Sequence, residues 1–237
     1  MAQKIPFNVI KSLPKAELHC HLDGSISAKT IIELAKEQGI ELPTFDEAEL
    51  KKLISVDETC ESLIEYLRGF DITGSVLQKP FAITRAVYEV CKDACADGIR
   101  YIEIRFSPVL HLKSGLSMGG VMEAAVEGLV MSELRLPIIA KLIVCGLRSL
   151  DPKVTESIAE IAWRYKDRGV VGFDLAGGPE QISSKHHREA FSIVHNKLIN
   201  CTLHSGEASG WQSVQDALQY CGAHRIGHGC HLIQNDD

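Results

Sequence analysis

The chain has 237 residues, and 25 basic against 31 acidic side chains give it a formal net charge of −6 at pH 7. The acidic surplus argues against nucleic acid or an anionic membrane as a partner, since both usually require basic surfaces. No apolar run reaches the roughly 20 residues that a membrane-spanning helix needs, and the first residues resemble neither a signal nor a transit peptide. We therefore expect a globular protein.

The eight cysteines contain no C-x-x-C pair. Disulfide frameworks are typical of smaller secreted domains. We therefore expect reduced thiols packed as small apolar side chains, and a cytoplasmic location.

The first predicted strand covers residues 16–23, and helical patterns alone fill residues 24–99. In this insertion we expect helices over 27–38, 44–54, 59–70 and 79–97. The capping-box spacing of Thr44 and Glu47 favours a helix that starts at Thr44. An insertion of this length is a candidate lid over the mouth of the sheet, and a decorative insertion is the alternative.

Strand and helix patterns alternate through the rest of the chain. Helices are expected near 118–135, 153–168, 184–199 and 211–222, between strands over 100–107, 138–145, 170–176, 201–205 and 225–228. Gly169 and Gly222 fall where helix C-termini favour a left-handed residue. This alternation predicts a parallel sheet, open or closed into a barrel, in a single domain over residues 1–237.

Two histidines lie two residues apart in the first strand, within the run AELHCHLD. The period of two in a strand puts His19 and His21 on one face, where neutral imidazoles suit Zn²⁺ and similar metals. Asp23 follows on the same face and adds an acceptor for a substrate. An H-x-H pair alone is weak evidence, because solvent-facing or structural histidines are equally common.

Further polar residues follow later strands. His204 ends an apolar strand and could supply a third metal ligand, and Glu207 lies three residues beyond it. His228 ends the strand at 225–228 between two glycines that permit close approach. Gly177, in the run DLAGG, could offer a backbone N–H to a substrate ring.

These candidates share one position, at the C-terminal ends of predicted strands. Catalytic groups occupy that rim in (β/α)₈ barrels. A doubly wound nucleotide-binding sheet would instead require a G-x-G-x-x-G turn after the first strand, where this chain has H-x-H-L-D-G. The pattern favours the barrel.

The motifs PKAELHCHLDGS, EIRFSP, VGFDLAGGPE, LHSGE and RIGHG, in this order, resemble the adenosine deaminase family from about residue 12 onward. The resemblance implies an α/β (β/α)₈ TIM-type barrel with helices inserted after the first strand. It also implies one Zn²⁺ per chain, and deamination of adenosine and 2′-deoxyadenosine to inosine products with release of ammonia.

The resemblance also assigns roles to residues. His19, His21 and His204 would ligate zinc, Glu207 would protonate purine N1, and His228 would orient and help deprotonate the attacking water. The remaining contacts to the nucleoside would come from Asp23 at the ribose, from the Gly177 backbone at the purine, and from Phe70 in an apolar lid.

Other functions stay open. HLDG favours a nucleoside over adenine, and the basic residues that an AMP deaminase would use for phosphate are not evident. Alternatives are an adenine or modified-purine deaminase, an inactive zinc-binding paralogue, and, less favoured, redox chemistry through the cysteines. The oligomeric state is not predicted.

The chain shows six strands, whereas the resemblance implies eight and a zinc-ligating Asp after the last one. Asp236 and Asp237 come too early to serve as that ligand and its neighbour. We therefore expect a barrel truncated after about six strands, with weak zinc binding, slow turnover and association through its open edge.

Overall fold

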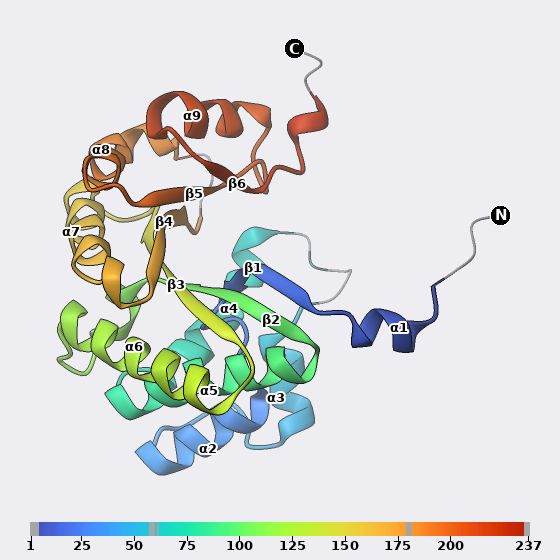
Figure 1. Cartoon of the computed structure of the whole chain (residues 1–237). Coiled ribbons are helices and arrows are strands. Elements are labelled where there is room, and N and C mark those ends of the chain that lie inside the picture. The colour runs from blue at the N-terminus through green and yellow to red at the C-terminus, as the bar shows by residue number, and fades with distance from the viewer. Residues whose placement is uncertain (1–4, 57–59, 61, 179–181, 235–237) are drawn as a thin grey trace.

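Six parallel strands form one sheet in strict chain order, β1-β2-β3-β4-β5-β6, in the computed structural model (Figure 1). The structure describes residues 5–56, 60, 62–178 and 182–234. The strands are β1 (Lys15–His21), β2 (Ile99–Phe106), β3 (Ile139–Leu147), β4 (Val170–Ala176), β5 (Asn200–Ser205) and β6 (Arg225–His228). A doubly wound sheet would reverse its strand order, so the sequential order identifies six strands of a TIM-type barrel. The predicted fold is confirmed.

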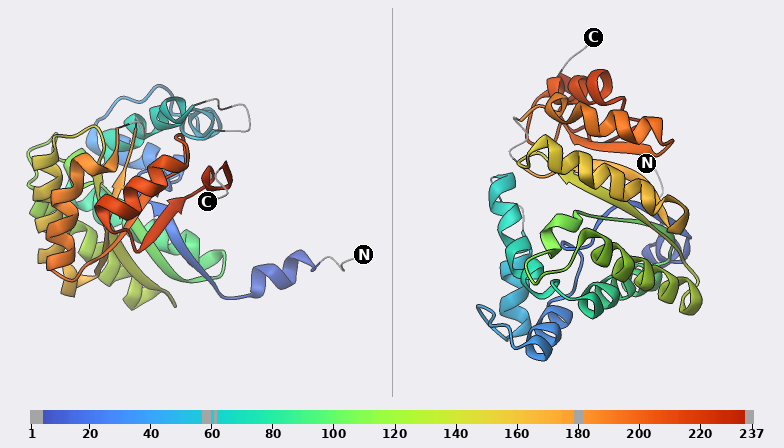
Figure 2. Two further views of the ribbon diagram at one scale, coloured as in Figure 1. Left: turned by 90° about the horizontal axis from the view of Figure 1, so that it is seen from above. Right: turned by 90° about the vertical axis from the view of Figure 1, so that its left-hand side faces the viewer.

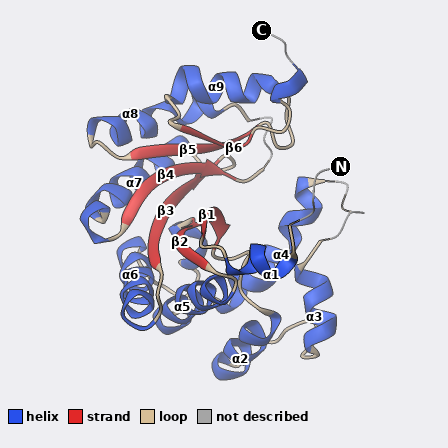
Figure 3. Ribbon diagram, turned by 45° about the vertical axis from the view of Figure 1, so that its right-hand side comes forward, coloured by secondary structure: helices blue, strands red, loops and turns tan. Residues whose placement is uncertain are grey.

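Helices cover the outer face of the strands (Figure 3). Those of the crossovers are α6 (Met118–Arg135), α7 (Pro152–Arg164), α8 (Arg188–Asn196) and α9 (Trp211–Cys221). The apolar core lies between these two layers, where Phe173 of β4 packs edge-on against Phe191 of α8 with ring centroids 5.3 Å apart. The outer layer leaves the C-terminal ends of the strands free to carry a site.

Most predicted boundaries agree with the structure. β4, β6 and α6 match residue for residue, and Gly169 and Gly222 have φ angles of +104° and +57°, as left-handed C-caps require. The helix predicted over 184–199 is instead a 3₁₀ turn followed by the shorter α8.

The insertion contains α2 (Ala28–Gln38), α3 (Glu47–Ile54), α4 (Leu63–Val76) and α5 (Pro80–Ala96). The predicted start of α3 at Thr44 is wrong. Asp46 is the N-cap and accepts a hydrogen bond from the Glu49 N–H, while the Thr44 hydroxyl donates to the Glu49 carboxylate at 2.8 Å. An Asp two residues closer to the helix satisfies the free N–H groups, so the capping-box spacing misplaced the start.

The predicted helix over 59–70 is shifted along the chain. Thr59 lies outside the described residues, and α4 begins after Ser62, whose side chain accepts from the Glu65 N–H. The helix then continues past the predicted end, Phe70, to Val76.

The sequence did not predict α1 (Phe7–Ser12), a short helix without buried residues. It extends away from the sheet in the left-hand view of Figure 2. Among the described residues, no helix combines the length and apolar character needed to span a membrane.

Candidate active site

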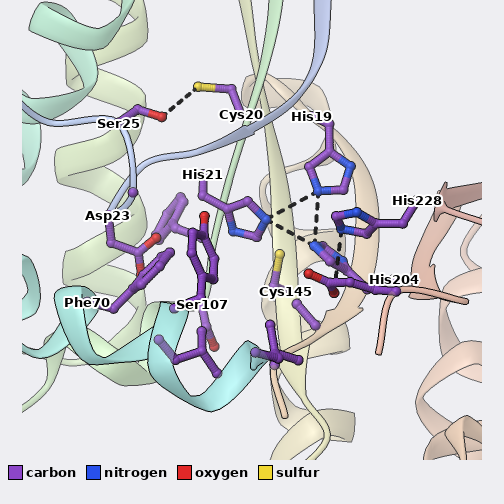
Figure 4. A pocket seen from close by; sticks show the side chains of 18 of the residues that line it. His19, Cys20, His21, Asp23, Ser25, Phe70, Ser107, Cys145, His204 and His228 are labelled. Carbon is purple, nitrogen blue, oxygen red and sulfur yellow. Dashed lines mark hydrogen bonds and ion pairs between the residues drawn. The ribbon is translucent and has the colours of Figure 1, made fainter. Parts of the chain in front are cut away.

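Three imidazole rings from β1 and β5 converge at the C-terminal ends of these strands (Figure 4). The Nε2 atoms of His19 and His21 each lie 3.0 Å from Nε2 of His204, and they lie 3.3 Å from each other. The β1–β2 pairing has a register shift between Glu17 and Cys20, beside the first of these rings. Bulges are common next to active sites because they re-aim side chains.

The spacing of the three nitrogens fits a tetrahedral metal site. Imidazole nitrogens at about 2.0–2.1 Å from Zn²⁺ lie about 3.3 Å from one another when the geometry is tetrahedral. His19 and His204 also lie within ligand distance of His228, which makes a second possible set of three. The four rings therefore offer two overlapping sets of three possible ligands, which share His19 and His204.

Burial keeps the two β1 histidines neutral. Desolvation, together with the positive charge of Arg105, lowers the pKa of His19 to about 3. Desolvation, and after it the neighbouring His204 ring, lowers the pKa of His21 to about 3. A neutral imidazole keeps a lone pair on one nitrogen, as a metal ligand must.

A buried carboxylate orients the third ring. Asp174 of β4 lies 3.0 Å from Nδ1 of His204 and 2.7 Å from the guanidinium of Arg105 on β2. Burial alone would raise the pKa of Asp174, but His204 and Arg105 outweigh it and hold the pKa well below its usual value. A carboxylate on Nδ1 directs the Nε2 lone pair toward the centre, as in carboxylate–histidine–zinc arrangements.

Two buried arginines fix the strands that carry the histidines. Arg105 donates from Nη2 to the Leu18 carbonyl of β1 at 2.7 Å, and Arg148 donates to the His204 carbonyl of β5. Both side chains are almost fully buried. The Arg105 guanidinium therefore ties β1 to β2 and β4, and the Arg148 guanidinium ties β5 to the loop that follows β3.

Sequence reasoning gave no role to Arg105, Asp174 or Arg148. The first two lie inside apolar strand runs, EIRF and FDLA, where an isolated charge is costly unless an opposite charge meets it. The opposite charges in these two buried strands could therefore have predicted that Arg105 and Asp174 pair. Arg148 lies in the loop after β3, where the sequence offered no comparable signal.

Glu207 and His228 lie beside the three rings. The Nε2 atom of His228 is 3.5 Å from a carboxylate oxygen of Glu207, and its ring centroid is 4.7 Å from that of His19. His228 has a φ angle of +70°, which is uncommon outside glycine and typical of functional sites. A Cβ on Gly227 would lie 2.9 Å from the His19 ring, so the close approach of β6 to that ring depends on this glycine.

The rings open into a cavity of about 1230 Å³. Asp23, Gly177 and Phe70 line it, as do Glu207 and the four rim histidines. Asp23 is buried, which raises its pKa to about 6, and its Oδ1 has no hydrogen-bond partner among the residues that the structure describes. A buried oxygen of this kind, facing a cavity, is suited to accept a hydrogen bond from a ligand bound there.

Gly177 and Phe70 approach this cavity from different elements. Gly177 follows β4 with a φ angle of +77°, a conformation that favours glycine. Phe70 comes from α4, and its ring meets that of His21 edge-on at 6.3 Å. A Cβ on Gly24 would lie 3.1 Å from the Phe70 ring, so the glycine of HLDG makes room for this aromatic side chain. All predicted site residues therefore lie around one cavity.

The chain therefore combines a parallel TIM-type barrel with a cluster of histidines at its C-terminal rim. A sequence profile described as adenosine deaminase matches residues 14–237. The chain belongs to the adenosine deaminase family.

Two curated relatives illustrate the similarity. The chain is 59% identical to a probable adenosine deaminase of Dictyostelium discoideum, over 99% of this chain and 30% of that protein. It is 36% identical to an adenosine deaminase of Clostridium perfringens, over 95% of this chain and 68% of the relative. The chain thus spans under a third of the Dictyostelium protein and about two thirds of the bacterial one.

Solved structures show the same fold. Adenine deaminase from Arthrobacter aurescens superposes with a TM-score of 0.86 at 23% identity, over 94% of this chain and 67% of that one. The N6-methyl-AMP deaminase of Arabidopsis thaliana gives a TM-score of 0.79 at 31% identity, over 94% and 66%. These relatives differ in substrate, so the family alone does not define the purine.

Proposed function

We propose that this chain is a zinc-dependent deaminase of adenosine and 2′-deoxyadenosine, with one catalytic Zn²⁺ on His19, His21 and His204. The observation that carries the proposal is the approach of three Nε2 atoms to within 3.3 Å of one another beside Glu207 and His228. Three neutral nitrogen ligands that leave a fourth position open are the pattern of a catalytic zinc site.

Zn²⁺ on these histidines would supply a Lewis acid that lowers the pKa of water from about 16 to about 7, which makes hydroxide available at neutral pH. His228 would orient the attacking water and accept its proton. Glu207 would donate a proton to N1 of the purine, which makes C6 electrophilic. The water oxygen would bond to C6, and His228 would pass the proton it accepted to the amino nitrogen, so that the bond between C6 and this nitrogen breaks and ammonia leaves. The remaining hydroxyl proton would return to Glu207, and C6 would keep the oxygen.

Other cavity residues would hold the nucleoside. Asp23 would accept a hydrogen bond from a ribose hydroxyl through its unpaired Oδ1. The Gly177 backbone would donate to the purine ring, and Phe70 would contact the ring's apolar surface. We further propose that α4 belongs to a lid formed by residues 24–99, because Leu63, Leu67 and Phe70 of this helix line the cavity.

The charge of the cavity favours a nucleoside over a nucleotide. Its described lining contains four carboxylates and neither Lys nor Arg: Glu17, Asp23, Asp93 and Glu207. A phosphate group carries about two negative charges at neutral pH and binds where Arg or Lys can pair with it. The lining would repel a phosphate and tolerate a neutral sugar.

A second candidate is a deaminase of a 6-substituted adenosine monophosphate. The 31% identity to the Arabidopsis enzyme, across 66% of that enzyme's chain, favours this candidate. A phosphate would then have to be held by residues outside the described lining.

A panel of five purines separates these functions. The zinc-loaded chain is mixed with adenosine, 2′-deoxyadenosine, adenine, AMP or N6-methyl-AMP, and loss of the exocyclic amine is followed by ultraviolet absorbance. We expect turnover of the two nucleosides to exceed that of the other three at least tenfold. Preference for either nucleotide would support the second candidate, and turnover of none would contradict both.

A further inference from the structure

A second group of metal-binding side chains lies at the opposite end of β5 from the rim. His195 belongs to the last turn of α8, Cys201 is the second residue of β5, and His224 immediately precedes β6. One ligand atom from each of the three lies within 4.8 Å of the others. The elements α8, β5 and β6 lie close together in Figure 1. Cys201 is near the start of β5, whereas His204 is near its end.

The distances to sulfur match those of a metal site. Sγ of Cys201 lies 3.5 Å from Nδ1 of His224 and 3.8 Å from Nε2 of His195. A sulfur at about 2.3 Å and a nitrogen at about 2.05 Å from Zn²⁺ are about 3.6 Å apart when the geometry is tetrahedral. After small movements of the two rings, the three side chains would therefore occupy three of the four ligand positions around a tetrahedral Zn²⁺.

The backbone brings His195 to this point. Gly222 ends α9 in the left-handed conformation, and a Cβ on it would lie 2.8 Å from Nε2 of His195. Any larger residue would displace the ring from the thiol. The same glycine thus serves as a helix cap and as room for the histidine.

The rings already have hydrogen bonds. His195 Nε2 pairs with the Cys221 carbonyl at 2.9 Å, and the Cys201 N–H donates to Nδ1 of His224 at 3.0 Å. Each is a neutral hydrogen bond, and its loss costs far less than the binding free energy that thiolate and imidazole ligands give Zn²⁺ in structural sites. His224 is exposed, so an ion can reach the group from solvent.

We propose that His195, Cys201 and His224 form a second, non-catalytic site for Zn²⁺. On binding, the Cys201 thiol releases its proton to solvent and forms a sulfur–zinc bond, while the two imidazoles bind through lone pairs. Water fills the remaining position. The ion links the end of α8 to the starts of β5 and β6, and this linkage is independent of the deaminase chemistry at the rim.

Cobalt spectroscopy tests the site, because a thiolate ligand gives Co²⁺ an intense near-ultraviolet charge-transfer band that histidine ligands do not. The metal-free 237-residue chain is titrated with Co²⁺, and bound zinc is counted in a parallel titration. We expect the thiolate band in the wild-type chain and its loss in Cys201→Ser. Bound zinc should fall by one ion per chain in both Cys201→Ser and His224→Ala.

Matched controls separate this site from folding defects and from the rim. Cys91→Ala alters another buried cysteine and His186→Ala another exposed histidine, and both should keep the band. The His19→Ala variant should also keep the thiolate band, although it should lose zinc at the rim. The test can therefore contradict the second site without contradicting the proposed catalytic site, and the reverse. The second site is overturned if wild-type protein shows no thiolate band, if the band survives Cys201→Ser, or if saturation requires millimolar metal.

Discussion

Histidines gather at both ends of β5, but the two ends hold them in different ways. At the C-terminal end, His204 is oriented by the carboxylate of Asp174, which is itself paired with Arg105 in a buried ion pair. At the N-terminal end, His195 and His224 are held by backbone groups around Cys201. The rim therefore depends on charges that balance one another, whereas the other end depends on neutral hydrogen bonds.

This difference has energetic consequences. A buried charge is tolerated only while its partner is present, so removing one partner destabilises strongly. Removing a neutral hydrogen bond typically costs about 1 kcal/mol. Removing Asp174 or Arg105 should thus damage metal binding and folding together, while removing a neutral hydrogen bond elsewhere should be milder.

The largest expected effect is on catalysis at the rim. Glu207→Gln keeps the shape of the side chain but removes the acid, so kcat for adenosine should fall about 10²–10⁴-fold. Bound zinc should stay unchanged, as metal analysis would show. Glu189→Gln on the outer face of α8 is the control and should keep full activity. Wild-type kcat in the Glu207→Gln variant would remove Glu207 from the mechanism.

The second largest effect is expected from loss of the buried ion pair between Asp174 and Arg105. Asp174→Asn leaves the Arg105 charge buried without a counter-charge, so the free energy of unfolding should fall by about 3–5 kcal/mol in urea titrations. Zinc should bind about 10–100-fold more weakly, because His204 loses its orienting carboxylate.

The matched control for that substitution is Glu103→Gln in β2. Glu103 pairs with Arg225 at 2.8 Å, but the Arg225 side chain is 40% exposed and stays solvated when its partner is lost. We expect a loss of only about 1 kcal/mol and unchanged zinc affinity. If the two variants lost equal amounts of unfolding free energy, the contrast between the buried rim pair and the partly exposed Glu103–Arg225 pair would be contradicted.

His111, a buried histidine outside both histidine clusters, allows the effect of burial to be tested through the pH dependence of stability. Desolvation lowers the pKa of His111 to about 4, and the ring lies 3.0 Å from the Leu77 carbonyl. Between about pH 6.5 and pH 4 the unfolded chain binds a proton that the folded chain does not, so stability falls as pH falls through this window. The total loss from this group is about 3 kcal/mol.

His111→Asn can keep the bond to Leu77 without the titration. Its unfolding free energy should therefore fall less steeply between about pH 6.5 and pH 4 than that of the wild-type chain, whatever its stability at neutral pH. Parallel pH profiles for the two chains would contradict a neutral buried His111.

The smallest effect concerns the unpaired carboxylate in the cavity. Asp23→Asn removes a buried charge whose Oδ1 lacks a partner in the described part of the chain, so the ligand-free chain should gain about 1 kcal/mol of stability. The proposed ribose contact should weaken, which would raise KM for adenosine. A less stable chain with unchanged KM would argue that Asp23 has a purely structural role.

Strand periodicity and strand ends predicted the fold and brought the rim residues together, because both are local properties of the sequence. The charges that support the rim were harder to predict. Arg105 and Asp174 are 69 positions apart, and only the strand order places their side chains in contact. The group around Cys201 was missed for the same reason, since His195, Cys201 and His224 come from three different parts of the chain.

The prediction that α3 starts at Thr44 failed for a local reason. Thr44 and Asp46 are both good N-caps, and a spacing rule cannot rank them when each finds a partner in Glu49. Asp236 and Asp237, which the sequence disfavours as metal ligands, lie outside the described residues.

Zinc-dependent activity measures the central claim most directly. Metal-free chain carrying Cys201→Ser, which removes competition from the second group, is titrated with Zn²⁺ while adenosine deamination is followed. The account predicts that activity rises until one ion is bound per chain, and that a further His204→Ala substitution abolishes both the activity and this binding. Deamination without zinc, or binding that persists without His204, would contradict it.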